Sequence, residues 1–316
     1  MLASRIVLTF AAALALLPLR AAVADEVVPQ PEKVSFYFAA HQDDWQLFMN
    51  PSAFEDVVDP NTKTIFVHVT AGDAGTGLGT RGRRFPYFLA RENGAEMAIR
   101  FMADARRFPL EKAAASVKFN GHTIYRVTYR NTVAYFLRLP DGNPDGTGYA
   151  DTGFQSLRRL ASGDLATLAA IDGSTVYRGW SDLVATVQAI LDVERGTAPI
   201  VQLNVAETDQ RINPRDHADH LMTAKAALDA SARLSCARKL FYVDYASSRL
   251  PANLSSQQRD METSVVAVTA AGISALDHGS IWQQYFQSYL GRNYFRVEEG
   301  VGRCSKSMAE LAPVKR

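Results

Sequence analysis

A buried strand that stops abruptly at a polar cluster is the feature that most constrains this fold. Residues 34–40 read VSFYFAA, a run of β-branched and aromatic side chains, and His41, Gln42, Asp43 and Asp44 follow directly. A continuous apolar run of this length is typical of a strand in a parallel sheet that is covered on both faces. Ligands bind beyond the carboxyl ends of such strands, so the loop that begins at His41 is well placed for chemistry.

The order of the remaining elements favours an α/β fold. Apolar runs at 64–70, 200–205 and 240–245 predict further buried strands, and helical periodicity at 87–103 and 214–233 places helices between them. Strands that alternate with helices in this way predict an open, three-layer fold with a mostly parallel sheet.

Residues 117–139 interrupt that alternation. Three short runs there predict antiparallel strands, and Asn120-Gly121 is a hairpin signal between the first two. Further helices are expected near 156–170, 181–194, 255–276 and 281–292. We therefore expect one antiparallel insert within a single domain that spans residues 25–316.

Residues 1–24 carry the pattern of an export signal. Arg5 precedes an uncharged apolar stretch at 6–17, and residues 22–24 (AVA) supply the small-x-small cleavage pattern. The stretch is short for a membrane span of about 20 residues. We expect cleavage, a periplasmic or secreted protein, and no integral membrane segment afterwards; an uncleaved anchor is the alternative.

The charge balance predicts which partners the chain does not seek. Lys and Arg number 34 against 33 Asp and Glu. A chain so close to neutral has no global electrostatic reason to bind nucleic acid or anionic lipid. The local run Arg81-Gly82-Arg83-Arg84 is basic, but such a run is usually a solvated loop.

The cysteine count and the expected export predict a disulfide. Cys236 and Cys304 are the two cysteines of the chain. An oxidising compartment favours a bridge between them, and two unpaired buried thiols are the alternative. Neither cysteine has the spacing of a metal site.

Two short clusters of histidine and aspartate carry the candidate chemistry. The first begins at His41, and the second is the run 217–220 (HADH). Asn213 and Pro214 are expected to start the helix that holds the second cluster, so His217 and His220 would share one helix face. Each cluster alone is as readily a turn or an ordinary helix face. Together they offer the ligands of a catalytic zinc, which needs about three protein groups and one open position.

These motifs resemble those of the PIG-L/LmbE-like de-N-acetylases. The strand end Ala-His-x-Asp-Asp at 40–44 and the later His-x-Asp-His carry the resemblance. The run TAGDAG at 70–75 resembles the family's loop after the second strand, and Arg91-Glu92 resembles its Arg-Glu segment. The likeness covers roughly residues 34 to 235. It implies a Rossmann-like fold and the removal of acetyl groups from N-acetylglucosamine-containing substrates.

The resemblance also implies roles for individual residues. His41, Asp44 and His220 match the family's metal ligands, and Asp43 matches its general base. His217 matches the histidine near the scissile amide, and Arg91 matches a substrate-contacting arginine. The implied cofactor is zinc, with another divalent transition metal as the alternative. Asp219 either orients a neighbouring group or is an exposed helix carboxylate.

The chain departs from the family pattern at three positions. Gln42 stands for Pro, Trp45 for Glu and Ala218 for a common Pro. None removes a ligand or the base, but Trp45 is expected to place a large aromatic ring beside the site, which bears on the substrate. The expected activity is removal of an N-acetyl group from an N-acetylglucosamine-containing glycan or glycoconjugate. The alternatives are hydrolysis of a different N-acyl amine, or a catalytically silent glycan-binding protein of the same fold.

Three other patterns receive a structural interpretation. The run 77–82 matches a dinucleotide fingerprint but stands alone, so a loop or a lid over the substrate is preferred. The acidic run 141–145 is expected to be a tight turn near the site rather than a calcium loop. The aromatic side chains at 282, 285, 286 and 289 are expected to pack in the core rather than stack on a sugar.

Overall fold

The computed structural model describes residues 30–105 and 110–304, and a central sheet organises them. The strands are β1 (Lys33–Ala39), β2 (Thr62–Thr70), β3 (Ala113–Phe119), β4 (His122–Tyr129), β5 (Thr132–Leu139), β6 (Thr167–Ala169), β7 (Val176–Arg178), β8 (Ile200–Ala206), β9 (Arg238–Tyr242) and β10 (Phe295–Glu298). The α-helices are α1 (Asp44–Phe48), α2 (Ser52–Val58), α3 (Tyr87–Ala103), α4 (Leu157–Ser162), α5 (Trp180–Arg195), α6 (Ala218–Ala230), α7 (Ser256–Ala275) and α8 (Trp282–Ser288), and the 3₁₀ helices are η1 (Ala150–Thr152) and η2 (Tyr245–Arg249).

The main sheet has eight strands in the order β10-β9-β8-β1-β2-β5-β4-β3. The five neighbours from β9 to β5 are joined by parallel pairings. Strands β10, β4 and β3 are added at the edges by antiparallel pairings. The predicted α/β class with a mostly parallel sheet is confirmed. The antiparallel region extends an edge of this sheet, because β5 itself pairs parallel with β2.

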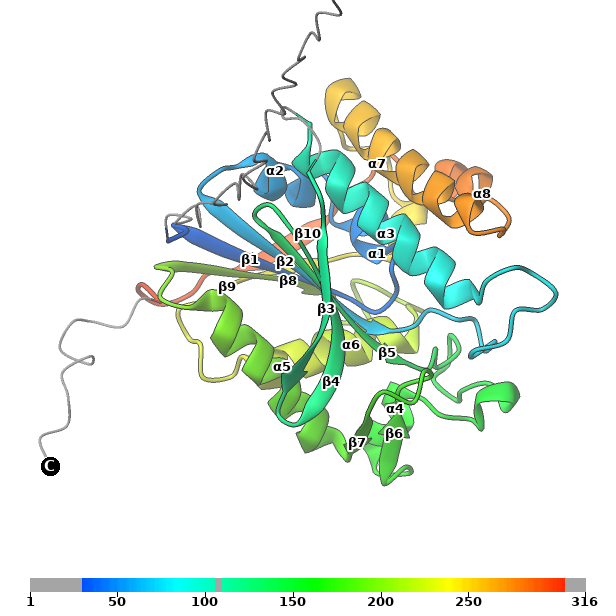
Figure 1. The fold of residues 1–316 in the computed structure, drawn as a ribbon. Coiled ribbons are helices and arrows are strands. Elements are labelled where there is room, and N and C mark those ends of the chain that lie inside the picture. Colours follow the sequence, from blue (N-terminus) through cyan, green and yellow to red (C-terminus); the bar gives the residue numbers. More distant parts are fainter. Residues whose placement is uncertain (1–29, 106–109, 305–316) are drawn as a thin grey trace, which may run out of the picture.

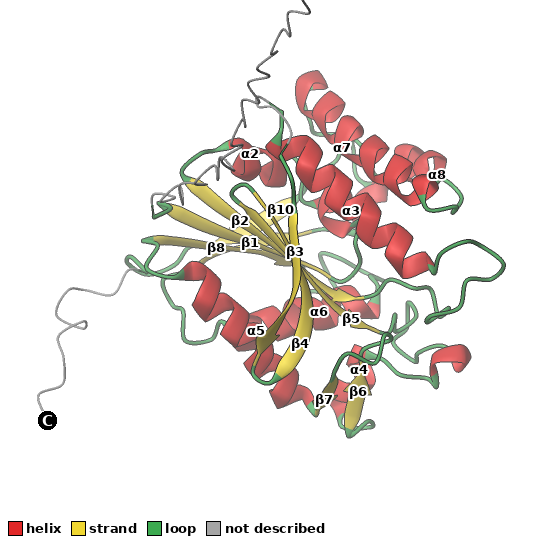
Figure 2. Cartoon of the chain, in the orientation of Figure 1, coloured by secondary structure: helices red, strands yellow, loops and turns green. Residues whose placement is uncertain are grey.

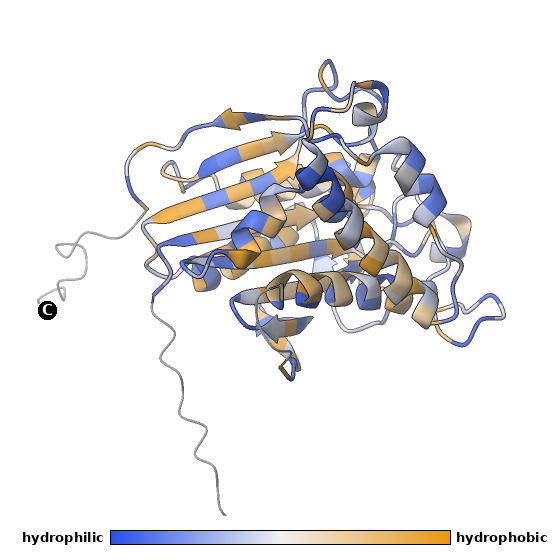
Figure 3. Ribbon diagram, turned by 90° about the horizontal axis from the view of Figure 1, so that it is seen from above, coloured by the Kyte–Doolittle hydropathy of each residue, from blue (hydrophilic) through white to orange (hydrophobic). Residues whose placement is uncertain are grey.

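Helices cover both faces of the sheet and give three layers (Figures 1 and 2). Alternate side chains of β1 divide between the two cores: Phe36 and Phe38 belong to the core beneath α5 and α6, whereas Tyr37 and Ala39 belong to the core beneath α2, α3 and α7. The central strands are accordingly hydrophobic along much of their length (Figure 3). Because both faces are buried, these strands read as continuous apolar runs in the sequence.

The strand order makes the end of β1 a topological switch point. From β1 the chain adds β2 and β5 on one side, and it later returns to add β8 and β9 on the other. The connection from β1 to β2 and the connection from β8 to β9 therefore run in opposite directions across the sheet. A crevice is expected at the carboxyl ends of β1 and β8, where the two directions diverge. The polar cluster that starts at His41 lies in this place.

Some predicted boundaries were wrong for local reasons. The helix expected over 156–170 ends at Ser162, because Gly163 takes a left-handed conformation with φ of 84°. The chain then forms the small antiparallel sheet of β6 and β7 instead. The helix expected over 281–292 ends at Ser288, and β10 follows as an edge strand.

The two cysteines of the chain are bonded to each other. Cys236 and Cys304 form a disulfide, with their Cα atoms 5.2 Å apart. No helix within residues 30–105 and 110–304 is long and apolar enough to cross a membrane. The expected export signal at 1–24 lies outside the described residues.

Helices α3 and α7 pack closely through a pair of glycines. A Cβ atom at Gly272 would lie 2.7 Å from the Cα atom of Gly94, and one at Gly94 would lie 2.7 Å from the carbonyl oxygen of Thr269. Both neighbours are backbone atoms, so they cannot rotate away. This contact sets the distance between α3 and α7, and α7 leads into α8.

The Gly272→Ala variant is therefore expected to be less stable than the wild type. Overpacking costs about 1–3 kcal/mol, which outweighs the gain of up to about 1 kcal/mol in helix propensity. Chemical denaturation should show a lower midpoint. Gly279→Ala is the matched control, because a Cβ atom there meets nothing within 4 Å. Equal midpoints for the two variants would contradict this account of the helix contact.

Candidate active site

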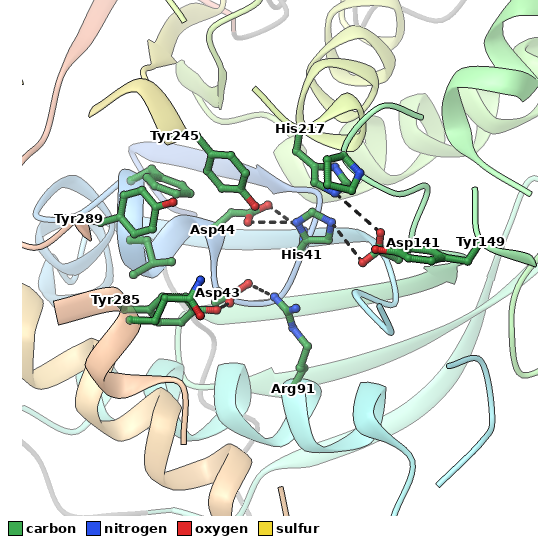
Figure 4. A pocket seen from close by; sticks show the side chains of 14 residues that line it. His41, Asp43, Asp44, Arg91, Asp141, Tyr149, His217, Tyr245, Tyr285 and Tyr289 are labelled. Atoms are coloured by element: carbon green, nitrogen blue, oxygen red, sulfur yellow. Dashed lines mark hydrogen bonds and ion pairs between the residues drawn. The ribbon is translucent and has the colours of Figure 1, made fainter. Parts of the chain in front are cut away.

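A pocket of about 220 Å³ opens at the carboxyl end of β1 (Figure 4). Its walls come from the loop between β1 and α1, the loop after β5, the start of α6, the 3₁₀ helix η2, and α8. The segment 281–289, whose aromatic residues were expected to serve core packing, thus also borders the pocket.

The segment between β1 and the start of α1 places His41, Asp43 and Asp44 at the pocket. The backbone N–H of His41 donates to Asp44 Oδ2 at 2.7 Å, which ties the first and last residues of the loop together. Asp43 is the N-cap residue of α1, yet its side chain makes no capping hydrogen bond. The Asp43 carboxylate therefore remains available to the pocket.

The start of α6 differs from the expectation and explains the orientation of His217. The helix begins at Ala218, and His217 rather than Asn213 is its N-cap residue. Arg215 has a φ of 61°, which is incompatible with a helix that starts at Pro214. The Asp219 backbone N–H donates to His217 Nδ1 at 3.1 Å. This bond places the His217 proton on Nε2, which faces Asp141 Oδ1 at 3.8 Å.

The three side chains expected as metal ligands converge. His41 Nδ1 lies 3.4 Å from Asp44 Oδ1 and 3.2 Å from His220 Nε2, and the last two atoms are 3.3 Å apart. Zinc takes nitrogen and oxygen ligands at about 2.0–2.1 Å, so tetrahedral ligands are separated by about 3.3–3.4 Å. The near-equilateral triangle of donor atoms therefore fits a tetrahedral zinc ion. All three residues are buried.

Two carboxylates behind His220 fix which nitrogen faces this triangle. His220 Nδ1 lies 2.9 Å from Asp216 Oδ1 and 3.2 Å from Asp244 Oδ2. A carboxylate accepts the Nδ1 proton, which leaves the lone pair of Nε2 directed at His41 and Asp44. Asp244 was not predicted as a site residue, because it follows β9 and nothing near it in the sequence marks it as a partner of His220.

A second group of side chains lies next to the other ring nitrogen of His41. His41 Nε2 lies 3.6 Å from Asp219 Oδ2 and 3.9 Å from Asp141 Oδ2. These separations are longer than those within the triangle, and His217 Nδ1 already accepts a backbone N–H. Asp219 is fully buried and accepts the Gly142 N–H at 2.7 Å, so it is an orienting group rather than an exposed carboxylate.

Asp43 is held by two side chains from the helical layer on one face of the sheet. Arg91 donates to Asp43 Oδ1, and the Tyr285 hydroxyl donates to Oδ2 (Figure 4). Arg91 also donates to the Gly72 carbonyl oxygen at 3.2 Å and lies over the Tyr87 ring. Arg91 was expected to contact substrate; in the structure its direct partner is Asp43.

Gly72 is required where Arg91 crosses the loop after β2. Its φ is +54°, and a Cβ atom there would lie 2.7 Å from Gln42 Oε1 and 3.1 Å from the Arg91 guanidinium. A side chain would therefore displace Arg91 from Asp43. This loop is the TAGDAG segment of the sequence.

Trp45 does not lie beside the pocket, which corrects the expectation for it. Its side chain is fully buried and its Nε1–H donates to His68 Nε2 at 3.1 Å. It packs against Phe66 in the core beneath α2 and α3. The aromatic residues that line the pocket are instead Phe48, Tyr149, Tyr245, Tyr285 and Tyr289.

Comparison with solved structures gives a distant likeness. No protein-family model matches the sequence, and no curated protein matches it. A solved structure of N,N'-diacetylchitobiose deacetylase from Pyrococcus horikoshii, complexed with its inhibitor MPG, superimposes with a TM-score of 0.47 and 13% sequence identity, over 85% of this chain and 84% of that chain. At this distance the likeness carries no conclusion about activity.

The Asp216→Asn variant is expected to bind zinc about 10- to 100-fold more weakly, because it loses a charged partner of His220 Nδ1. Competition with a chromophoric chelator measures the affinity. Asp192→Asn, an exposed change on α5, is the matched control and should bind zinc as the wild type does. Unchanged affinity in Asp216→Asn would show that this carboxylate does not support the site.

Zinc affinity should also rise with pH through the neutral range. Burial alone would lower the pKa of His41, but Asp44 and Asp219 raise it to about 9 in the metal-free protein. A bound ion must displace that proton, so affinity should increase at least about tenfold per pH unit until the pH approaches this pKa. The same chelator competition, repeated at several pH values, measures the slope. An affinity that levels off near the ordinary pKa of histidine, about 6.5, would contradict it.

Proposed function

We propose that this chain is a zinc-dependent hydrolase that removes an N-acetyl group from an N-acetylglucosamine-containing glycan or glycoconjugate. The observation that carries the proposal is the triangle of His41, Asp44 and His220 donor atoms beside a further carboxylate, Asp43, within one pocket. The resemblance of the sequence motifs to the de-N-acetylases supports the substrate class.

His41, Asp44 and His220 would hold the ion, with another divalent transition metal as the alternative to zinc. When bound, such an ion supplies Lewis acidity, which polarises an amide carbonyl and acidifies water. Two imidazoles and one carboxylate are a donor set that suits this chemistry. Asp216 and Asp244 keep His220 in the required tautomer.

Asp43 is the proposed general base. Its carboxylate lines the pocket next to Asp44 and is oriented by Arg91 and Tyr285. Each carboxylate oxygen has a second lone pair, so Asp43 can accept a proton from an attacking water while both contacts persist. Arg91 and Tyr285 thereby fix the direction from which the proton is taken.

His217 is the proposed donor to the oxygen of the scissile amide. Burial and the neighbouring His41 and His220 lower the pKa of His217 to about 2, so the ring is neutral. The proton on Nε2 nevertheless faces the pocket, because Nδ1 accepts a backbone N–H. A neutral imidazole N–H can stabilise the oxyanion of the tetrahedral intermediate. Asp43, once protonated, is then the better source of a proton for the departing amine.

The proposed function predicts a separation of metal binding from turnover. Asp43→Asn should keep bound zinc but release acetate at least about 100-fold more slowly, because it lacks the general base. Acetate release from a panel of N-acetylated sugars, with zinc-loaded and chelated protein, measures turnover. Asp260→Asn, an exposed change on α7, is the control.

The possible outcomes distinguish the alternatives. Full activity in Asp43→Asn would remove the proposed base. Sugar binding without acetate release by the wild type would indicate a silent glycan-binding protein. Release of a different carboxylic acid from another N-acyl amine would keep the hydrolase and change its substrate.

A further inference from the structure

A second pocket, of about 320 Å³, opens beside the candidate active site and is basic. Its polar lining consists of Arg81 and Arg83 from the loop after β2, two threonines of the same loop, Tyr87 at the start of α3, and His278 after α7. None of the described residues that line it is acidic. We call this the basic pocket.

The basic pocket shares a wall with the active-site pocket. Tyr87 lines the basic pocket, and the Arg91 guanidinium, which lines the other, lies 5.6 Å from the centre of the Tyr87 ring. Ala74 of the basic pocket donates its backbone N–H to Asp141 Oδ2 at 3.3 Å, and Asp141 lines the active-site pocket. The two pockets are therefore adjacent, so different groups of one molecule at the surface could lie in each.

Several donors of the basic pocket are available to a ligand. Within the described part of the chain, Arg81 and Arg83 form no ion pair, and both side chains are exposed. The His278 Nε2–H donates to the Phe85 carbonyl oxygen at 2.9 Å, which orients the ring beside Tyr87. Arg84 is different, because its guanidinium lies over Phe85 and its backbone N–H donates to Asp277.

The two pockets differ in their charged groups. The active-site pocket contains Asp43, Asp44 and Asp141 beside Arg91, whereas the basic pocket contains two guanidinium groups and no carboxylate. Guanidinium groups bind carboxylate, phosphate and sulfate oxygens through paired N–H donors. An acetamido group and an anionic group on one molecule would each meet a complementary surface.

We propose that the basic pocket binds an anionic group of the substrate whose acetamido group occupies the active-site pocket. The substrate class is then an acidic N-acetylated saccharide, with a carboxylate, phosphate or sulfate on or next to the acetamido sugar. This inference rests on the proposed function for the acetamido group. It assigns the run Arg81-Gly82-Arg83, which sequence analysis interpreted as a solvated loop, to substrate recognition.

The test compares two deacetylated disaccharides, which cannot be hydrolysed, as ligands of the zinc-loaded protein. One pairs glucosamine with a neutral hexose, and the other pairs it with the corresponding uronate. Calorimetry at low ionic strength should show about five- to tenfold tighter binding of the uronate, as expected for two exposed ion pairs. The preference should fall as ionic strength rises from about 0.01 M to about 1 M, because the Debye length falls from about 30 Å to about 3 Å.

Substitution of the two arginines should abolish the preference. In Arg81→Gln/Arg83→Gln, the ratio of the two affinities should fall to near one. The matched control is Arg233→Gln/Arg303→Gln, which removes two exposed arginines near the Cys236–Cys304 disulfide and should keep the wild-type ratio. Equal binding of both ligands by the wild type, no binding of either at millimolar concentration, or a preference that survives in the first variant would overturn the proposal.

Acetate release from the N-acetylated forms of the same disaccharides separates this proposal from the proposed function. A uronate preference in binding without acetate release from either would sustain the anion site and refute the proposed deacetylation of these saccharides. Acetate release at equal kcat/KM from both, together with equal binding, would sustain the hydrolase and refute the anion site.

Discussion

The burial of four carboxylates around two imidazoles is the constraint on which the site depends. Asp44, Asp216, Asp219 and Asp244 are each at most 9% exposed. In the described part of the chain, their ion-pair partners are histidines rather than lysine or arginine. Buried carboxylates are costly without a compensating positive charge. The carboxylates accordingly raise the pKa values of His41 and His220, and a divalent cation would supply positive charge at the same point.

The fold brings these groups together because the segments that hold them follow three parallel strands, β1, β8 and β9. His41 and Asp44 follow β1, the carboxyl end of its neighbour β8 leads into the segment that holds Asp216, and the carboxyl end of β9, the next strand, leads to Asp244. Parallel strands place all three ends at the same edge. The chemistry is therefore a consequence of strand order, since an antiparallel β8 would carry His220 to the opposite edge.

The sequence allowed the fold class and the convergent residues to be predicted, but not the contacts that orient them. The strand at 34–40 could be recognised because burial on both faces removes polar residues from it. The histidines stood out because they fell in short polar runs at the ends of predicted elements. Asp244 and Tyr285 could not be found in this way. Each acts on a residue far along the chain, His220 and Asp43 respectively, and such pairings depend on tertiary packing.

Trp45 and the start of α6 show how local interpretation fails. Trp45 follows two site residues in sequence, but the first turn of a helix points successive side chains about 100° apart, so it enters the core while Asp44 faces the pocket. Asn213-Pro214 has the composition of a helix start, yet Arg215 takes a left-handed conformation and delays the helix to Ala218. That delay makes His217 the N-cap residue, and the capping bond fixes the tautomer on which its proposed role depends.

The site takes its residues from both layers of helices. The triangle of ligand atoms belongs to the β1 loop and α6, on the side of α5 and α6, whereas the two side chains that hold Asp43 come from α3 and α8. The glycine contact determines how closely α3, which holds Arg91, packs on α7, and the chain that follows α7 leads to Tyr285. A disturbance of this contact would therefore reach Asp43 through Arg91 and Tyr285. The side chains that hold the proposed base therefore come from helices other than those that carry the proposed metal ligands.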